Sequence, residues 1–335
     1  MNTKKRHLNV LVSGLTGLFL FFLTYGTHAV AGDVVNYRLK WLFNTSVAGD
    51  IMADAGGFFK RAGLDVQVKE GGPEKNAIKE LELGYADFGV ASADQVIRAL
   101  DKGADVVVLA QLFQVNPMQW IYRTDQAEIK SLADLKNRHI GVTFGGNDET
   151  IMSTLLAKAG FTKKDVRISS VRFDFTPFLK KKVDVWPVYR NSQGVILEDK
   201  LAAAGESVRF FNPADFGVSF VANSVVTSGK MMEKKPDQVN AFLTSLLDAW
   251  EFAMDPANQK QVLSEIKKRD KGTKDEIRKK QLDATRVLIK PASHIKIGAI
   301  DIKAWQQTEA IMINEKQVKK SVYVDSRLVG LKLMK

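Results

Sequence analysis

The sequence predicts an α/β protein with two lobes, each built on a mainly parallel sheet flanked by helices. Short apolar or alternating segments, which are typical of strands, alternate with longer segments of helical spacing over most of the chain. Small-residue turns follow the strands, as is usual where a parallel strand leads into a helix. The chain has 335 residues, which is enough for two domains. We expect a cleft between the two lobes.

The first 31 residues have the three parts of a secretory signal peptide. Basic residues at positions 4–6 precede an apolar run at 10–23, and Ala29-Val30-Ala31 forms a cleavage site of small residues. The apolar run is short for a membrane span, which takes about 20 residues. We therefore expect cleavage after Ala31 and export to the periplasm.

Residues 32–121 are expected to form the first part of lobe 1, organised around the stretch 70–93. Pro73 suits the first position of a helix because it has no N–H to leave unbonded. Gly84 suits the position after the helix. The pattern predicts strands at 37–42, 64–68, 86–91 and 104–110, and helices at 47–60, 73–83 and 94–100.

Residues 122–215 are expected to form lobe 2, and residues 216–335 the second part of lobe 1. A strand at 118–123 is expected to lead the chain out of lobe 1, and a strand at 220–226 to lead it back. Between them the pattern predicts strands at 139–142, 166–171, 183–188 and 209–212, and helices at 132–136, 149–159, 176–182 and 193–201. The remainder carries amphipathic spacing, which predicts helices at 236–254, 258–268, 274–287 and 302–314.

Composition excludes several classes of function. The formal net charge is +11, and +8 remains without the first 31 residues. The remaining Lys and Arg residues are spread along the chain and are not interleaved with aromatic residues, which favours a solvated basic surface over a nucleic-acid interface. Cysteine is absent, so thiol catalysis, disulfides and cysteine-held zinc are excluded.

Signatures of catalysis are also missing from the sequence. There is no dinucleotide-binding glycine motif, phosphate-binding loop, zinc-protease motif or nucleophile elbow. After residue 31 the chain has two histidines, His139 and His294, which lie far apart in sequence. Neither a zinc site nor a nucleophile with its base is expected from them. We expect no cofactor and no metal.

The recurring pattern is a strand followed by a small-residue turn that carries an aromatic or amide group. An apolar wall with a few placed hydrogen-bonding groups is what a small-molecule site needs. In such a site aromatic residues would stack on a planar ligand, and amide and hydroxyl groups would bind its edge. The candidate ligand-binding residues are Trp41, Asn44, Gly71, Gly72, Ser92, Asn116, Gly145, Gly146, Asn147, Tyr189 and Asn191.

The glycine pairs in this set leave a second kind of ligand open. Backbone N–H groups at Gly71-Gly72 and Gly145-Gly146 lie near expected helix starts, where they suit an anion such as a sulfonate or phosphate. Asp148 and Glu149 follow the second pair and argue against a highly charged anion. We expect Asp148 to cap the helix there.

Four blocks of the sequence carry a family resemblance: WLFNT at 41–45, GFFKRAGLDV at 57–66, GYADFGV at 84–90 and LADLKNRHIGV at 132–142. They resemble periplasmic substrate-binding proteins of ABC importers, in the SsuA/THI5-like branch for nitrate, sulfonate, taurine and thiamine-pyrimidine precursors. The resemblance implies a two-lobed type II periplasmic binding protein fold that closes on its ligand by a hinge. It also implies delivery of a small molecule to an ABC permease in the inner membrane. We expect a monomer that binds no nucleic acid.

The sequence looks nearest to the binders of thiamine-pyrimidine precursors, which are related to fungal pyrimidine synthases. Where those proteins carry Trp-x-Pro-Asn-Thr-Asn-His, this chain has Trp-Leu-Phe-Asn-Thr-Ser-Val at 41–47. The synthases use that histidine, a lysine that binds pyridoxal phosphate and a cysteine-rich motif. Here Val47 replaces the histidine, Asp54 stands about where the lysine would be, and cysteine is absent. We therefore expect a non-catalytic binder of a planar, pyrimidine-like heterocycle. A synthase-like enzyme, an anion binder and a ligand sensor remain the alternatives.

Overall fold

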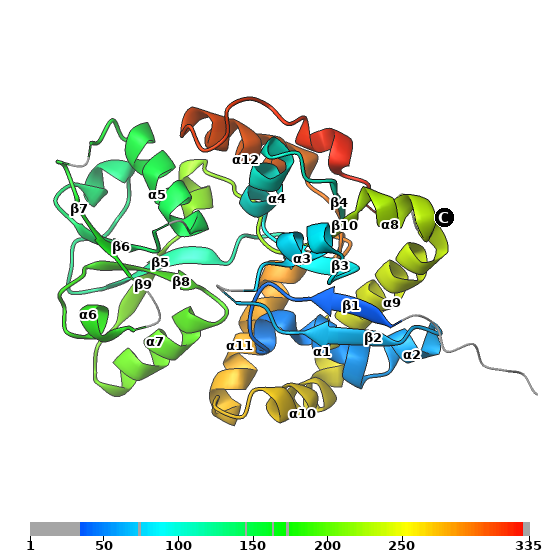
Figure 1. The fold of residues 1–335 in the computed structure, drawn as a ribbon. Coiled ribbons are helices and arrows are strands. Elements are labelled where there is room, and N and C mark those ends of the chain that lie inside the picture. The colour runs from blue at the N-terminus through cyan, green and yellow to red at the C-terminus, as the bar shows by residue number, and fades with distance from the viewer. Residues whose placement is uncertain (1–33, 73–74, 145, 163, 172–173, 331–335) are drawn as a thin grey trace, which may run out of the picture. The chain divides into compact units, whose positions relative to one another are not determined.

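The computed structural model describes residues 34–72, 75–144, 146–162, 164–171 and 174–330. The expected signal peptide lies outside these residues, as do Pro73 and Gly145. No helix in the described part of the chain is long and apolar enough to cross a membrane. The described strands form two five-stranded sheets, each flanked by helices (Figure 1).

The sheet of lobe 1 has the strand order β2-β1-β3-β10-β4. Strand β1 (Val35–Arg38) pairs in parallel with β2 (Val66–Lys69) and with β3 (Phe88–Ala91). Strand β10 (Ser224–Ser228) returns from lobe 2 and lies antiparallel between β3 and β4 (Val106–Gln111). Every residue of β3 and β4 is buried, because helices cover both faces of the sheet.

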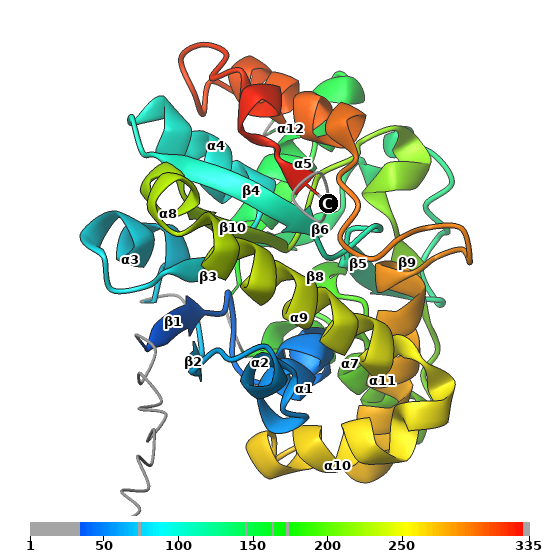
Figure 2. The ribbon, with the colours of Figure 1, turned by 90° about the vertical axis from the view of Figure 1, so that its right-hand side faces the viewer.

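Helices from both ends of the chain cover this sheet. Helix α9 packs against α1, and Figure 2 shows α9 crossing in front of the sheet. The helices of lobe 1 are η1 (Thr45–Val47), α1 (Ala48–Ala55), α2 (Phe58–Arg61), α3 (Ala77–Leu83), α4 (Ala93–Asp101), α8 (Gly229–Lys234), α9 (Pro236–Met254), η4 (Pro256–Asn258), α10 (Gln259–Arg269), α11 (Asp275–Ile289), α12 (Ile302–Asn314) and η5 (Val324–Arg327).

The sheet of lobe 2 has the order β7-β6-β8-β5-β9. Strand β6 (His139–Val142) pairs in parallel with β7 (Arg167–Ser170) and β8 (Val185–Tyr189). Strand β5 (Met118–Arg123) lies antiparallel between β8 and β9 (Val208–Phe211). The helices of this lobe are η2 (Leu132–Leu135), α5 (Asn147–Lys158), α6 (Thr176–Leu179), α7 (Gln193–Ala203) and η3 (Pro213–Phe216).

Two segments cross between the lobes. The first runs from the end of β4 to the start of β5, at 112–117, and the second from the end of β9 to the start of β10, at 212–223. All of β5 belongs to the lobe 2 sheet, so the first crossing precedes the boundary expected at 121/122. Asn116 ties the two segments together, because its Nδ2 donates to the Phe220 carbonyl at 2.7 Å.

Two expected helices differ most from the bounds that the sequence pattern predicts. The helix expected at 47–60 is interrupted, because Gly57 adopts a φ of 73° between α1 and α2. The helix expected from Pro73 starts at Ala77 instead. The Asn76 side chain accepts from the N–H groups of Ile78 and Lys79, which makes Asn76 the N-cap.

The buried core lies on both sides of each sheet. In lobe 1, Phe242 of α9 stacks on Phe88 with ring centroids 3.7 Å apart, and Tyr37 meets Phe242 edge-on at 5.0 Å. A second cluster contains residues of both lobes, among them Trp120 of β5 and Trp305 of α12. The lobes thus share buried apolar surface near the crossing segments.

Candidate functional site

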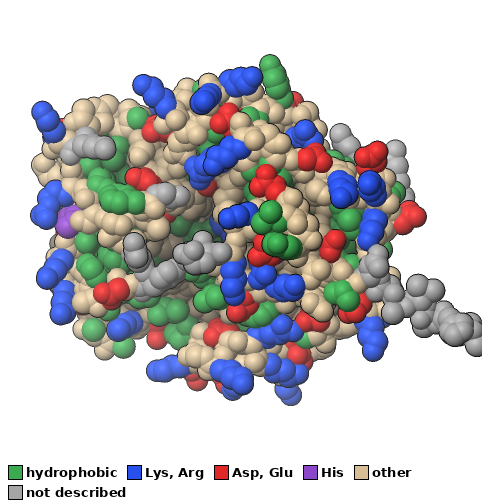
Figure 3. All heavy atoms as spheres, in the orientation of Figure 1, with side chains coloured by type: hydrophobic (Ala, Val, Ile, Leu, Met, Phe, Trp, Pro, Cys, Tyr) green, Lys and Arg blue, Asp and Glu red, His purple; other side chains and the backbone are tan. Residues whose placement is uncertain are grey.

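A cavity of about 650 Å³ lies between the lobes, within the size range of small-molecule sites. Its walls come from the segments that follow β1, β6 and β7, from β8 and the turn after it, and from Met118 of β5 and Asn223 before β10. These are mainly the carboxyl ends of parallel strands, where ligands bind in open α/β sheets. In Figure 3 the surface is hollowed between the two lobes, and hydrophobic side chains lie along the hollow.

Lobe 1 presents the turn after β1. The Asn44 side chain accepts from the Ser46 N–H at 2.8 Å and so caps η1, which leaves its amide N–H₂ group for the cavity. The Gly71 N–H donates to the Trp41 carbonyl at 3.0 Å. A Cβ at Gly71 would lie 2.0 Å from the Leu39 carbonyl oxygen, so only glycine permits this approach. Gly71 therefore supports the turn that carries Trp41.

Lobe 2 presents an aromatic wall made by Phe144, Phe175, Trp186 and Tyr189. Trp186 is buried and contacts Phe175, with ring centroids 6.4 Å apart. The Tyr189 N–H donates to the Gln193 side chain at 3.1 Å, which holds the end of β8 against the start of α7. Phe144 is exposed beside the cavity. This wall offers aromatic and apolar surface to a ligand.

Asp148 organises the loop that leads into α5. It is the second residue of that helix, and its Oδ2 accepts from the Thr143 N–H at 2.5 Å. The expectation of a helix cap is thus wrong, because the carboxylate bonds back to the loop. Burial raises the pKa of Asp148 to about 6, against the hydrogen bonds from Thr143 that lower it. Asp148 is therefore mostly ionised at pH 7.

The cavity carries little net charge. Among its described lining residues the charged ones are Lys40 and Asp148, one of each sign, and no arginine is present. The Lys40 ammonium donates to the Tyr189 hydroxyl at 3.2 Å and so joins the two lobes across the cavity.

Five of the predicted residues line the cavity: Trp41, Asn44, Gly146, Asn147 and Tyr189. Gly145 lies outside the described residues. Gly71, Gly72, Ser92, Asn116 and Asn191 do not line it.

Ser92 and Asn191 have other partners. Ser92 forms a capping box at the start of α4, and the next N–H, of Ala93, donates to the Val221 carbonyl at 3.1 Å. The return segment thus covers the turn after β3. The Asn191 Nδ2 donates to Thr285 Oγ1 at 2.9 Å and to Ser46 Oγ at 3.1 Å, so this buried amide bridges the lobes.

The sequence pattern did not single out several lining residues, notably Lys40, Ser46, Gln193 and Asn223. One signal was available for Asn223. The run 220–226 is apolar except for Asn223 and Ser224, and Asn223 directly precedes β10.

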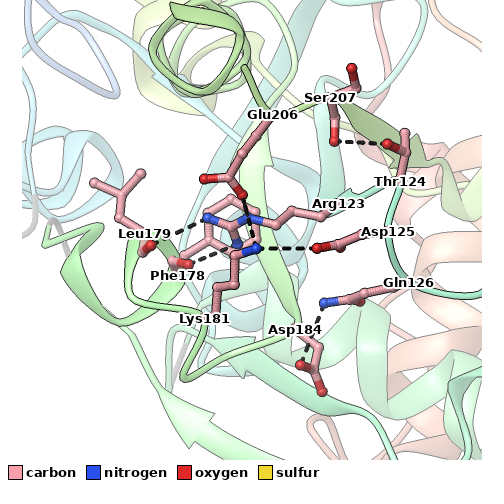
Figure 4. A network of polar contacts seen from close by, with 10 residues as sticks. All are labelled: Arg123, Thr124, Asp125, Gln126, Phe178, Leu179, Lys181, Asp184, Glu206 and Ser207. Carbon is pink, nitrogen blue, oxygen red and sulfur yellow. Dashed lines mark hydrogen bonds and ion pairs between the residues drawn. The ribbon is translucent and has the colours of Figure 1, made fainter. Parts of the chain in front are cut away.

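A separate polar network lies at the far end of β5 from the cavity (Figure 4). The buried Arg123 side chain donates to the Phe178 carbonyl at 2.9 Å and to the Leu179 carbonyl at 3.3 Å, and it pairs with Glu206. Lys181 pairs with Glu206 at 3.4 Å. Met118, at the other end of β5, lines the cavity. This network therefore ties lobe 2 together and is not part of the ligand cavity.

Two sheets joined by two crossing segments, with a cavity at the strand ends, define the fold of periplasmic binding proteins. One solved structure with this fold is the periplasmic aliphatic sulphonate binding protein SsuA from Escherichia coli. It aligns with a TM-score of 0.69 at 18% identity, covering 88% of this chain and 91% of that one. The predicted fold class is confirmed.

A family model described as NMT1/THI5 like matches residues 44–259. The chain belongs to the NMT1/THI5-like family, as the resemblance predicted. One relative, from Haemophilus influenzae, is called a putative thiamine biosynthesis protein; it is 26% identical over 245 residues, covering 72% of this chain and 76% of its own. Another, from Halalkalibacterium halodurans, is called a formylaminopyrimidine-binding protein; it is 24% identical over 243 residues, covering 70% and 72%.

Proposed function

We propose that this protein is a non-catalytic periplasmic substrate-binding protein that captures a pyrimidine-like heterocycle and delivers it to an ABC permease. The observation that carries the proposal is the cavity between the lobes, which combines an aromatic wall with amide groups and little net charge. A flat nitrogen heterocycle needs this combination. The relative named for binding a formylaminopyrimidine supports the same ligand class.

Each lobe has a defined role in the proposal. Trp41 from lobe 1 and Tyr189 from lobe 2 would stack on the ring, while Asn44 and Asn147 would bond to its edge. The crossing segments 112–117 and 212–223 would act as the hinge, because they are the segments of the described chain that connect the two sheets. The ligand would then be enclosed when the lobes close.

An anion-binding function is the second candidate. The sulphonate-binding structural neighbour and the N–H groups at the start of α5 favour it. The ionised Asp148 beside those groups disfavours it, because a second negative charge in a low-dielectric cavity is repelled.

A synthase-like enzyme is less compatible with this chain. Val47 lines the cavity at the position where the synthases carry histidine, and the sequence holds no cysteine. The side chains that the synthase chemistry uses are therefore replaced.

The test is a thermal-shift and calorimetric titration of the protein purified from the periplasm of a Gram-negative host. We expect reversible stabilisation by aminopyrimidines, about 2.7 kcal/mol at a hundredfold excess over the dissociation constant. The intact mass should correspond to cleavage after Ala31. Binding of alkanesulfonates alone would support the anion candidate, and turnover of the pyrimidine would support the enzyme.

A further inference from the structure

We propose that Asn223 and Asn147, one in each lobe, select a neutral heteroaromatic ligand that carries both a hydrogen-bond donor and a hydrogen-bond acceptor. The inference rests on the proposed function and specifies the ligand that the same cavity takes. Asn223 would accept from the ligand's N–H group, and Asn147 would donate to its ring nitrogen or carbonyl. Both residues line the cavity.

The side chain of Asn223 has a hydrogen-bond acceptor without a partner among the described residues. Its side chain is 5% exposed, and its Oδ1 has no hydrogen-bond partner among the described residues. Its backbone is held in place, because its carbonyl accepts from the N–H of Leu112 at 3.0 Å. Buried polar atoms in folded proteins are nearly always bonded, and leaving one unbonded is unfavourable. Asn223 lines the cavity, so a ligand N–H group that reaches Oδ1 as the lobes close would satisfy this acceptor.

In lobe 2, the side chain of Asn147 has a hydrogen-bond donor without a partner among the described residues. Asn147 is the first residue of α5, and its Nδ2 has no partner in the part of the chain that the structure describes. Two hydrogen bonds join described residues next to it, from the Thr143 N–H to Asp148 Oδ2 at 2.5 Å and from the Gly146 N–H to the Thr143 carbonyl at 2.7 Å. Asn147 is thus placed at the start of α5, beside the cavity.

The pair discriminates between ligand classes. A sulfonate or nitrate has only acceptor oxygens, so it satisfies Asn147 but meets the lone pairs of Asn223 Oδ1 and the carboxylate of Asp148. A purely apolar ring satisfies neither amide. An amino-substituted heteroaromatic ring satisfies both, and only while it touches both lobes, so selection is coupled to closure.

The experiment compares three probes by calorimetry: 4-aminopyrimidine, 4-methylpyrimidine and propanesulfonate. The methyl group matches the amino group in size but donates no hydrogen bond. We expect the unaltered protein to bind 4-aminopyrimidine about tenfold or more tightly than 4-methylpyrimidine. Losing the amino group leaves a buried acceptor without its hydrogen bond, and a loss of this kind changes the affinity by about that factor. Asn223→Leu should abolish this preference.

Stability measurements separate recognition from a structural role. Because Asn223→Leu removes an unbonded acceptor, the melting temperature of the ligand-free variant should stay the same or rise. Asn116→Leu is the matched control: both ends of that amide are bonded, to the Phe220 carbonyl at 2.7 Å and from the Met118 N–H at 2.9 Å, so its melting temperature should fall. Asn147→Asp removes the donor yet suits a helix start, so it should fold and bind both pyrimidines more weakly.

Two outcomes overturn the inference while the proposed function stands: equal affinity of the unaltered protein for the two pyrimidines, or a lower melting temperature in Asn223→Leu. Binding of propanesulfonate with no binding of either pyrimidine overturns the proposed function as well.

Discussion

The two lobes share an architecture but contribute different chemistry to the cavity. Lobe 1 supplies mostly polar groups from the turn after β1 and from Asn223, with Trp41 as its aromatic residue. Lobe 2 supplies most of the apolar wall, with Phe144, Trp186 and Tyr189 among its residues. The difference follows from which segments cover the turns at the carboxyl ends of the strands in each lobe.

In lobe 1 the returning segment covers the turn after β3, through the bond from the Ala93 N–H to the Val221 carbonyl. The end of β4 is also covered, because Gln111 bonds to Gly298 and to the Trp305 indole. In lobe 2 the turns after β6, β7 and β8 all open onto the cavity. Segments late in the chain, at 221 and at 298–305, thus decide which turns of lobe 1 can reach a ligand.

The interiors of the lobes also differ in the side chains at their centres. The centre of lobe 1 is a stack of aromatic rings around Phe242. Lobe 2 holds the side chain of Arg123, which is buried and bonded to two carbonyls and to Glu206 (Figure 4). Lobe 1 has a buried arginine too, Arg278 of α11, but it bonds to the Asp270 and Thr273 carbonyls within its own helical segment and lies outside the aromatic stack.

The largest expected effect is in the aromatic stack. Phe242→Ala should lower the free energy of unfolding by about 3–5 kcal/mol, because it empties a fully buried site that contacts Phe59 and Phe88. Urea unfolding followed by tryptophan fluorescence measures the loss. Tyr85→Ala, at an exposed position in the same lobe, is the control and should change little. Equal losses in the two variants would contradict the role given to the stack.

Lobe 1 also contains a buried carboxyl. Asp50 Oδ1 accepts from the Tyr37 hydroxyl at 2.6 Å, and burial raises the pKa of Asp50 from 3.8 to about 7. The folded state therefore keeps a proton that the unfolded state releases above about pH 4. The free energy of unfolding should fall as pH rises from 4 to 7, by at most about 1.4 kcal/mol per pH unit from this group.

Asp50→Asn keeps an acceptor for Tyr37 and removes the titration, so the slope between pH 4 and pH 7 should become shallower. Urea titrations at several pH values measure it. Asp54→Asn on the same helix is the control, because it leaves Asp50 in place. An unchanged slope in Asp50→Asn would refute this account.

Removing the buried cation of lobe 2 should also lower the free energy of unfolding, but by less than Phe242→Ala does. Arg123→Met should lower the free energy of unfolding by about 3 kcal/mol, because the Phe178 and Leu179 carbonyls lose their donor. Lys181→Met removes an exposed member of the same network and should cost less than about 1 kcal/mol. If the two losses prove equal, Arg123 is not the centre of the network.

The smallest effect is expected where the lobes meet. Asn191→Ala removes the buried bonds to Ser46 and Thr285 and should favour separation of the lobes by about 1–2 kcal/mol. Small-angle scattering should show a larger radius of gyration without ligand, and ligand affinity should fall. Lys280→Gln breaks the exposed ion pair with Asp199 across the same interface and should change neither. An unchanged radius in Asn191→Ala would show that other contacts hold the lobes together.

Local signals in the sequence determined most of the elements. Helices α9 and α12 have the bounds that their amphipathic spacing predicted, and β5 and β6 also match their expected ranges. In these segments the periodicity and the turn residues act within a few neighbours along the chain, so the sequence alone carries the information. The family could also be inferred from the order of short motifs, with the fold that it implies.

The tertiary structure decided which turns form the site. Ser92 and Asn147 both follow a strand in a small-residue turn, and nothing local separates them. The turn at Ser92 is covered because the Val221 carbonyl, in the returning segment, bonds to the next N–H, of Ala93, while Asn147 lines the cavity. Asn223 enters the cavity because β10 is inserted between β3 and β4. Contacts between residues so distant in sequence depend on how the whole chain packs, so they leave no local pattern to read.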